Sequence, residues 1–307
     1  MASDVTIDIA GPRIDIREKI DEVIEKFRAI EVSCTRFNPT SPLMLANANP
    51  TIWNPLPKIA IDVIRAAYEA YKMTEGVFDP RILDDLVKSG YDAKLRFDSN
   101  TEFKNEPVEV PAKHPRNEWK PEFRSQEVLL GDAPIDLGGI GKGYAVQSAM
   151  DILQDYADGV LINAGGDIAA EGLNDEEDLW RIGIENPWDP EGEPVRVVEL
   201  EDVSIATSSI RLRSWKHDGR VTHHLIDPST GTPGGEGLIA VSAIAASTSV
   251  AEIWSKTLFL KGLTEIEEFA AVHSIPALWI AESGNVFSNG AFEENAIWGV
   301  TRALPKK

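Results

Sequence analysis

A predicted strand, a cluster of glycines and a predicted helix follow one another directly between residues 127 and 153. Val128-Leu-Leu indicates a short strand, and Ile135-Asp-Leu leads into Gly138-Gly-Ile-Gly-Lys-Gly143. The helix that follows has apolar residues at helical spacing, namely Tyr144, Val146, Ala149, Ile152 and Leu153. Glycines between a strand and a helix start offer backbone N–H groups to an anion. The segment predicts either a flexible turn or a phosphate site, and the flanking Asp136 and Lys142 favour the phosphate site.

The spacing of these glycines excludes two common nucleotide-binding motifs. A P-loop requires Ser or Thr after its Gly-Lys pair, but Gly143 follows Gly141-Lys142, and Asp136 stands where the first glycine of that motif belongs. A dinucleotide fingerprint requires G-x-G-x-x-G, and Tyr144 occupies the position of its third glycine. Any phosphate site here is therefore of another kind.

The rest of the chain alternates helical and strand patterns. Amphipathic helices are predicted over residues 14–30 and 59–73, with a third helix over 251–260. Strands are predicted over 159–164, 180–185, 195–200, 204–207 and 239–245, with a hairpin over 278–287. Because no Gly/Ser linker or repeat divides the chain, we expect an α/β (α+β) protein, with a mixed sheet flanked by helices, as one interwoven unit over 1–307. The polar, proline-containing stretch 92–125 is interpreted as an elaborated hairpin or a surface excursion.

Composition excludes several classes of protein. The chain has 30 Lys+Arg against 50 Asp+Glu, a net charge of −20, which argues against wide contact with nucleic acid or an anionic membrane but still permits a small phosphate-bearing ligand. The one cysteine, Cys34, excludes an internal disulfide. No stretch approaches the roughly 20 apolar residues of a membrane span, and the first residues do not resemble a signal peptide. We expect a cytoplasmic protein.

Two further segments combine turn chemistry with reactive side chains. In Thr222-His-His-Leu-Ile-Asp227-Pro-Ser-Thr-Gly231, Pro228 ends a strand, so that His224 and Asp227 can turn towards one space. In Thr74-Glu-Gly-Val-Phe-Asp79-Pro, Gly76 permits a close approach of the backbone to a ligand. Taken alone, the first segment is better explained as a turn capped by Asp227, and the second as an ordinary exit from a helix into a loop.

Taken together and in this order, the segments resemble the ApbE family, the FAD:protein FMN transferases. The resemblance runs from about Ile14 to Gly262. The motifs that carry it are Ser33-Cys-Thr-Arg-Phe-Asn-Pro-Thr-Ser-Pro with Asn47, Thr74-Glu-Gly-Val-Phe-Asp79-Pro, Ile135-Asp-Leu-Gly-Gly-Ile-Gly-Lys142-Gly-Tyr-Ala-Val, Leu161-Ile-Asn-Ala-Gly-Gly-Asp167-Ile, Ile205-Ala-Thr-Ser-Ser209, His224-Leu-Ile-Asp-Pro-Ser-Thr-Gly231 and Ala251-Glu-Ile-Trp-Ser-Lys256-Thr-Leu-Phe-Leu-Lys-Gly262. The N-terminal strand of the family is weak or absent in this sequence.

The resemblance implies that FAD is the donor and that a Ser/Thr hydroxyl of a target protein attacks the FMN-side phosphorus, with release of AMP. It implies that FAD is bound by Val77, Phe78, Asp79, Asp136, Lys142 and Thr207. It places His224 and Asp227 on the attacking side, as the catalytic pair. It also implies Mg²⁺ at the pyrophosphate, held partly by the backbone carbonyl of Gly139.

The late helix departs from the family pattern at the metal. Where the resemblance implies an Asp and a Thr one helical turn apart, this chain has Glu252 and Lys256. Glu252 can still ligate Mg²⁺, but a protonated Lys256 cannot, and it brings a positive charge to that place. Two alternatives to the transferase therefore stay open: an FAD-binding protein of the same fold with lost or altered transfer, and an FAD pyrophosphatase. The sequence identifies neither the acceptor protein nor the oligomeric state.

Overall fold

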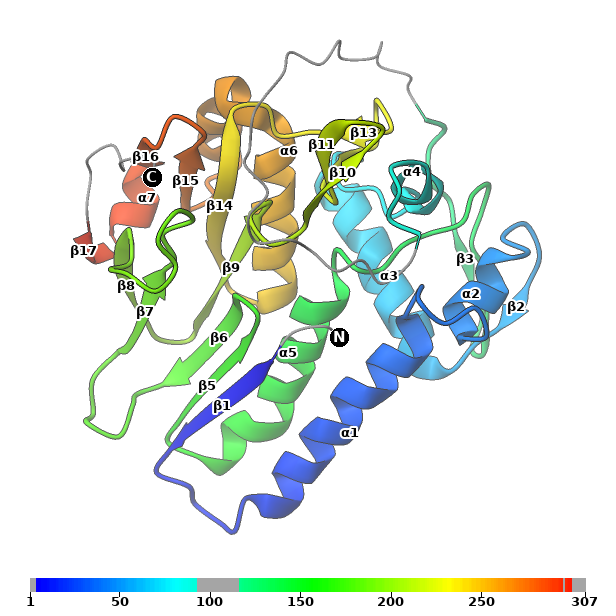
Figure 1. Cartoon of the computed structure of the whole chain (residues 1–307). Coiled ribbons are helices and arrows are strands. Elements are labelled where there is room, and N and C mark those ends of the chain that lie inside the picture. The colour runs from blue at the N-terminus through cyan, green and yellow to red at the C-terminus, as the bar shows by residue number, and fades with distance from the viewer. Residues whose placement is uncertain (1–3, 93–115, 295, 300–307) are drawn as a thin grey trace. The chain divides into compact units, whose positions relative to one another are not determined.

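The computed structural model describes residues 4–92, 116–294 and 296–299 (Figure 1). The chain divides into two compact units, each built from separate stretches of sequence. The first unit comprises Met1–Arg28, Lys142–Ser208 and Glu236–Lys307, and the second comprises Ala29–Gly141 and Ser209–Gly235. The interwoven path follows from these ranges, while the extent of the protein as one domain stays a prediction.

A seven-stranded sheet forms the centre of the first unit. Its strand order is β1 (Val5–Ala10), β5 (Gly159–Ala164), β6 (Asp167–Gly172), β9 (Val203–Ser209), β14 (Leu238–Ala245), β15 (Ala277–Ala281) and β16 (Val286–Ser288). The pairs β1–β5, β5–β6, β6–β9, β14–β15 and β15–β16 are antiparallel. This sheet with its flanking helices confirms the predicted α/β class.

The edge strand β1 corrects the sequence analysis, which found the N-terminal strand weak or absent. Val5, Ile7 and Ile9 alternate with polar residues, the period-two pattern of a strand with one buried face. The whole of β1 pairs with β5, from Val5 opposite Ala164 to Ala10 opposite Gly159. The pattern is short, which is why it carries a weak signal without its partner strand.

The two faces of the sheet are covered differently. On one face, α5 (Gly141–Leu153) and the first part of α1 (Arg17–Cys34) contribute Val146, Leu153 and Val23 to a core with Val160 and Ile162. On the other face, residues such as Ile205 and Ile280 pack against β7 (Trp180–Ile184) and β8 (Arg196–Leu200), which form a three-stranded sheet with β17 (Ala296–Gly299). Apolar side chains thus exclude water from both sides of the central strands.

Helix α6 (Thr248–Val272) lies beside α5, on the same side of the sheet in Figure 1. It is longer than predicted, and it is interrupted at Gly262, whose φ of 69° is left-handed and favours glycine. Short elements of the same unit are η1 (Gln154–Tyr156) and α7 (Gly290–Glu293). The interruption explains why the sequence pattern predicts an end near residue 260.

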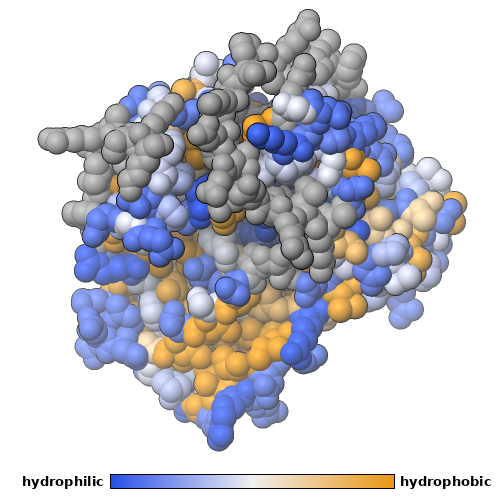
Figure 2. Space-filling view, viewed as in Figure 1, coloured by the Kyte–Doolittle hydropathy of each residue, from blue (hydrophilic) through white to orange (hydrophobic). Residues whose placement is uncertain are grey.

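Apolar atoms gather over the lower part of the face in Figure 2, where β1, β5 and α1 lie in Figure 1. Ile7 and Ile9 of β1 and Ile20 of α1 are only partly buried, and Val5 and Ile24 are exposed. Exposed apolar side chains are common in proteins and indicate no partner by themselves.

The second unit contains the remaining helices and small sheets. Its helices are α2 (Pro42–Asn47), α3 (Lys58–Met73) and α4 (Leu83–Lys88). Its strands are β2 (Asn54–Pro55), β3 (Glu122–Phe123), β4 (Glu127–Leu129), β10 (Ser214–His217), β11 (Arg220–His223), β12 (Ile226–Asp227) and β13 (Thr232–Pro233). Trp119 is fully buried and meets the rings of Tyr68 and Tyr71 edge to face, at centroid distances of 5.5 and 5.8 Å.

The predicted excursion over 92–125 lies mostly outside the described residues, because 93–115 are not among them. Its described part contains Trp119 and β3, which pairs with β4. In the described part of the chain, no helix combines the length and apolar character that crossing a bilayer requires.

Candidate functional site

Four charged side chains meet inside the first unit. Lys142 comes from the first turn of α5, Asp167 from the start of β6, and Glu252 and Lys256 from α6. Lys142 pairs with Asp167, and its Nζ lies 3.7 Å from Glu252 Oε1. Lys256 Nζ donates to the same Oε1 at 2.8 Å. We call these four residues the lysine–carboxylate cluster.

Burial differs sharply between the acids and the lysines of the cluster. The side chains of Asp167 and Glu252 are 1% and 0% exposed, whereas those of Lys142 and Lys256 are 15% and 14% exposed. The two carboxylates are thus buried, and the lysine side chains that pair with them keep some access to solvent. This arrangement suits an anion that approaches the lysines.

Local backbone geometry builds the cluster. Gly165 and Gly166, both at positive φ, form the tight turn between β5 and β6 that places Asp167 at the first position of its strand. Gly143 N–H donates to Glu252 Oε2 at 2.8 Å, so a carboxylate caps the first turn of α5. A Cβ on Gly143 would lie 2.7 Å from the carbonyl oxygen of Thr248. Glycine at 143 therefore permits the close contact of α5 with α6.

The electrostatics of the two acids reflect their surroundings. Burial, together with the charge of Glu252, raises the pKa of Asp167 to about 6 against the opposing effect of Lys142 and Lys256. Burial also acts to raise the pKa of Glu252, but attraction by Lys256 and Lys142 outweighs it and holds that pKa below its ordinary value. Glu252 is therefore the ionised acid that anchors both ammonium groups.

Predicted residue Thr207 lies on β9 next to this cluster. Its N–H donates to the carbonyl of Gly166 at 3.2 Å, and its hydroxyl pairs with that of Ser242 at 2.8 Å. Ala206, its neighbour in the chain, stands opposite Asp167 in the β6–β9 register. The structure thus brings together four predicted residues of the first unit, namely Lys142, Thr207, Glu252 and Lys256.

The second unit holds the predicted residues Asp79 and Asp136, each paired with an arginine. Asp79 accepts hydrogen bonds from Arg81 through both carboxylate oxygens, including 2.8 Å from Nη2 to Oδ2. Arg81 also donates to Asp132 and to the carbonyl of Asn117, each at 2.8 Å. This buried network fixes the turn after α3, and Asp79 is a structural anchor as well as a predicted flavin contact.

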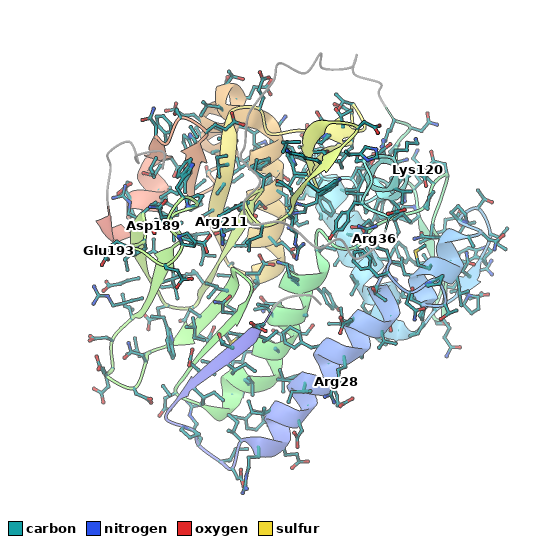
Figure 3. All side chains as sticks on the ribbon, viewed as in Figure 1. Arg28, Arg36, Lys120, Asp189, Glu193 and Arg211 are labelled. Carbon is teal, nitrogen blue, oxygen red and sulfur yellow. The ribbon has the colours of Figure 1, made fainter. Side chains whose placement is uncertain are left out.

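Asp136 pairs with Arg36, which follows the end of α1 by two residues. Arg36 is labelled in Figure 3. Arg36 Nε lies 3.2 Å from Asp136 Oδ2, and the guanidinium carbon lies over the rings of Phe37 and Tyr91, at 4.3 and 4.1 Å from their centroids. Its Nη2 is buried and has no hydrogen-bond partner in the described part of the chain. A buried donor of this kind is costly unless an acceptor reaches it.

Other predicted residues also belong to the second unit. Phe78 is buried, its N–H donates to Thr74 Oγ1 at 3.0 Å, and Val77 and Gly139 are half-buried. Asp227 Oδ1 accepts from the N–H and hydroxyl of Ser229, at 2.8 and 2.7 Å. Asp227 thus caps its own turn, and the roles predicted for these residues stay predictions.

His224 and its neighbour His223 differ in their surroundings. His224 Nδ1 lies 3.4 Å from the carbonyl oxygen of Arg213. His223 Nδ1 accepts the N–H of Leu225 at 3.3 Å, and desolvation lowers the pKa of His223 to about 4. His223 is therefore a neutral, structural side chain at ordinary pH.

Three residues of these clusters lie outside the predicted site set: Asp167, Arg36 and Arg81. Asp167 ends the Gly-Gly-Asp motif, a signal that points to it. Arg81 follows Asp79 by two residues, and its bidentate pairing could be inferred from that turn. Arg36 lies far from Asp136 in sequence, and nothing local indicates their pairing.

The fold is that of solved ApbE proteins. The ApbE protein of Thermotoga maritima superposes with a TM-score of 0.79 at 23% identity, over 96% of this chain and all of that one. The flavin transferase ApbE of Vibrio cholerae gives a TM-score of 0.75 at 21% identity, over 96% of both chains. At such identities the likeness shows the fold alone.

Sequence comparison then gives the family. The model of the ApbE family matches residues 1–279, and this chain belongs to that family. The FAD:protein FMN transferase of Escherichia coli K12 is 30% identical over 166 residues, which is 53% of this chain and about half, 47%, of that protein. The Haemophilus influenzae protein of the same name is 25% identical over 90% of this chain and 83% of its own length.

Proposed function

We propose that this protein transfers FMN from FAD to a Ser or Thr hydroxyl of an acceptor protein and releases AMP. The lysine–carboxylate cluster carries the proposal, because it presents two ammonium groups at the glycine-rich start of α5. Membership of the ApbE family and the names of the relatives support FAD as donor and a protein as acceptor. Lys142 and Thr207 are the proposed phosphate contacts of the first unit.

The chemistry forms one bond and breaks one. The acceptor oxygen attacks the FMN-side phosphorus, the bond from that phosphorus to the bridging oxygen breaks, and AMP leaves with the electron pair. The hydroxyl proton must go to a base. When His224 Nδ1–H donates to the Arg213 carbonyl, the lone pair of the ring is on Nε2, the form that accepts a proton. We assign this role to His224, with Asp227 holding the turn beside it.

In the second unit, Arg36 and Asp136 are the proposed partners of another part of the nucleotide. The unpartnered Nη2 of Arg36 supplies a donor, and Asp136 supplies a carboxylate that is held by that arginine and by Gly138 N–H at 2.8 Å. Val77, Phe78 and Asp79 complete the proposed flavin contacts. An acceptor oxygen on the ligand would satisfy the arginine.

The resemblance also implies Mg²⁺, and the residues present do not fit it. Both oxygens of Glu252 already accept N–H donors, one from Lys256 and one from Gly143. Within the described residues, no group of three or more acidic, His or Cys side chains is placed to hold a metal ion. No step of the mechanism is therefore routed through a metal, and the carbonyl of Gly139 has no assigned ligand role.

The test is incubation with FAD, with and without a flavin-acceptor domain, followed by chromatography for AMP and FMN. The proposal expects AMP to appear with acceptor-bound flavin, and His224→Ala to slow this by about 10²–10⁴-fold. Free FMN with AMP and no acceptor labelling would instead identify a pyrophosphatase. Intact FAD retained by the protein would identify a carrier, a candidate that the lysine at 256 specifically favours.

A further inference from the structure

We propose that the lysine–carboxylate cluster is a metal-free phosphate site, in which the Lys256 ammonium supplies the positive charge beside Glu252 and excludes a divalent cation. The choice of FAD as natural ligand rests on the proposed function. The exclusion of metal rests on the cluster alone. The two parts can therefore fail separately.

The oxygens of Glu252 leave little space for a divalent cation. Mg²⁺ prefers six oxygen ligands in an octahedron at about 2.0–2.1 Å. At Glu252, Oε1 is held by Lys256 at 2.8 Å and Oε2 by Gly143 N–H at 2.8 Å. A cation at Oε1 would share that oxygen with the Lys256 ammonium and would therefore lie next to a group of like charge.

The charges of the cluster balance within the protein. Asp167 and Glu252 are buried and are matched by two lysines, so the acids are already compensated without a metal. Within the described residues, the Lys256 ammonium has one hydrogen-bond partner, Glu252, although an ammonium carries three donors. Its remaining donors suit phosphate oxygens.

Lys256 is also held near the start of α5. Lys256 is one helical turn from Glu252, whose other oxygen caps the first turn of α5. Glu252 thereby holds both the Lys256 ammonium and the start of α5, and the N–H groups of a helix start attract anions. A monovalent point charge fixed in this way can bind phosphate without organising its oxygens as a metal does.

The first experiment measures metal binding to FAD-free protein, with Mn²⁺ as the probe and electron paramagnetic resonance as the readout. We expect no Mn²⁺ bound at the cluster of the unaltered protein, and a new site in the Glu252→Asp/Lys256→Thr variant, which removes the ammonium group. Stoichiometric Mn²⁺ on the unaltered protein that Glu252→Gln abolishes would overturn the proposal, whether or not FMN is transferred.

The second experiment measures FAD and inorganic pyrophosphate affinity by calorimetry, in EDTA and in excess MgCl₂. We expect the same affinity in both conditions, and Lys256→Met to weaken binding by roughly 10- to 100-fold, as for loss of a charged hydrogen bond. If Lys256→Met unfolds because Glu252 loses its lysine, the double variant Glu252→Gln/Lys256→Met removes that acid as well. The same loss of affinity is then measured on the double variant. The proposal would be overturned if either ligand bound only in the presence of Mg²⁺, or if neither FAD nor pyrophosphate bound at all.

A matched control is Lys58→Thr. Lys58 and Asp62 form another Lys–carboxylate pair one helical turn apart, but the Lys58 side chain is 83% exposed. This variant should alter neither ligand affinity nor Mn²⁺ binding. FAD binding in EDTA without AMP release would contradict the proposed transfer and leave the metal-free site standing.

Discussion

Two groups of buried charges in this protein, the Asp79–Arg81 pair of the second unit and the lysine–carboxylate cluster of the first, differ in how far they are closed. In the second unit, the side chains of Arg81 and Asp79 are 2% and 3% exposed and form a bidentate pair. Arg81 also donates to the carbonyl of Asn117. In the first unit, the carboxylates are buried but their lysines retain some exposure. A closed pair stabilises a turn, whereas a pair with exposed donors can also bind a ligand.

The largest effect on stability is expected from breaking the closed pair. Arg81→Met leaves Asp79 buried without its partner, which costs about 3–5 kcal/mol of unfolding free energy. Denaturant unfolding followed by circular dichroism measures it. Asp79→Asn/Arg81→Met should recover much of the loss. A loss below about 1 kcal/mol, the value of exposed pairs, would contradict the closed-pair interpretation.

The next effect is a pH dependence of the free energy of unfolding that arises from His223. Its folded pKa of about 4 lies below the ordinary 6.5, so the unfolded chain binds the proton more strongly. Its contribution is present above pH 6.5 and is lost as the pH falls from 6.5 to 4, by up to about 3 kcal/mol. The measurement is the free energy of unfolding of the unaltered protein and of His223→Gln between pH 6.5 and pH 4. Parallel pH profiles for the two would contradict the assignment.

A smaller effect is expected where α5 meets α6. Gly143→Ala places a Cβ 2.7 Å from the Thr248 carbonyl and 2.8 Å from Glu252 Oε2, and such overpacking costs about 1–3 kcal/mol. It should also weaken phosphate binding, because it displaces the acid that anchors Lys256. Gly141→Ala is the control, since a Cβ there meets no atom within 4 Å. Equal stability of the two variants would contradict the close contact.

The local sequence pattern predicts part of the lysine–carboxylate cluster. The strand–glycine–helix order identifies Lys142, and the sequence places Glu252 and Lys256 one helical turn apart. The convergence of Asp167 on that pair depends on the β5–β6 turn and on α6 packing against α5. These are long-range contacts with no local signal.

The structure differs from the sequence predictions where a feature depends on contacts that are distant in the sequence. The strand β1 is short and gains its stability from pairing with β5, so its alternation alone is a weak signal. The helix from Thr248 passes beyond Leu260 because Gly262 interrupts it without ending it. Arg36 is missed because its partner Asp136 is distant in sequence, and burial of Nη2 is visible only in three dimensions.

The central claim is that the lysine–carboxylate cluster binds phosphate. The most direct measurement is the affinity of Lys142→Ala for FAD and for riboflavin, which lacks phosphates, by calorimetry in EDTA. The account predicts that FAD binding weakens by roughly 10- to 100-fold while riboflavin binding is unchanged. Equal losses for the two ligands, or unchanged FAD binding, would contradict it.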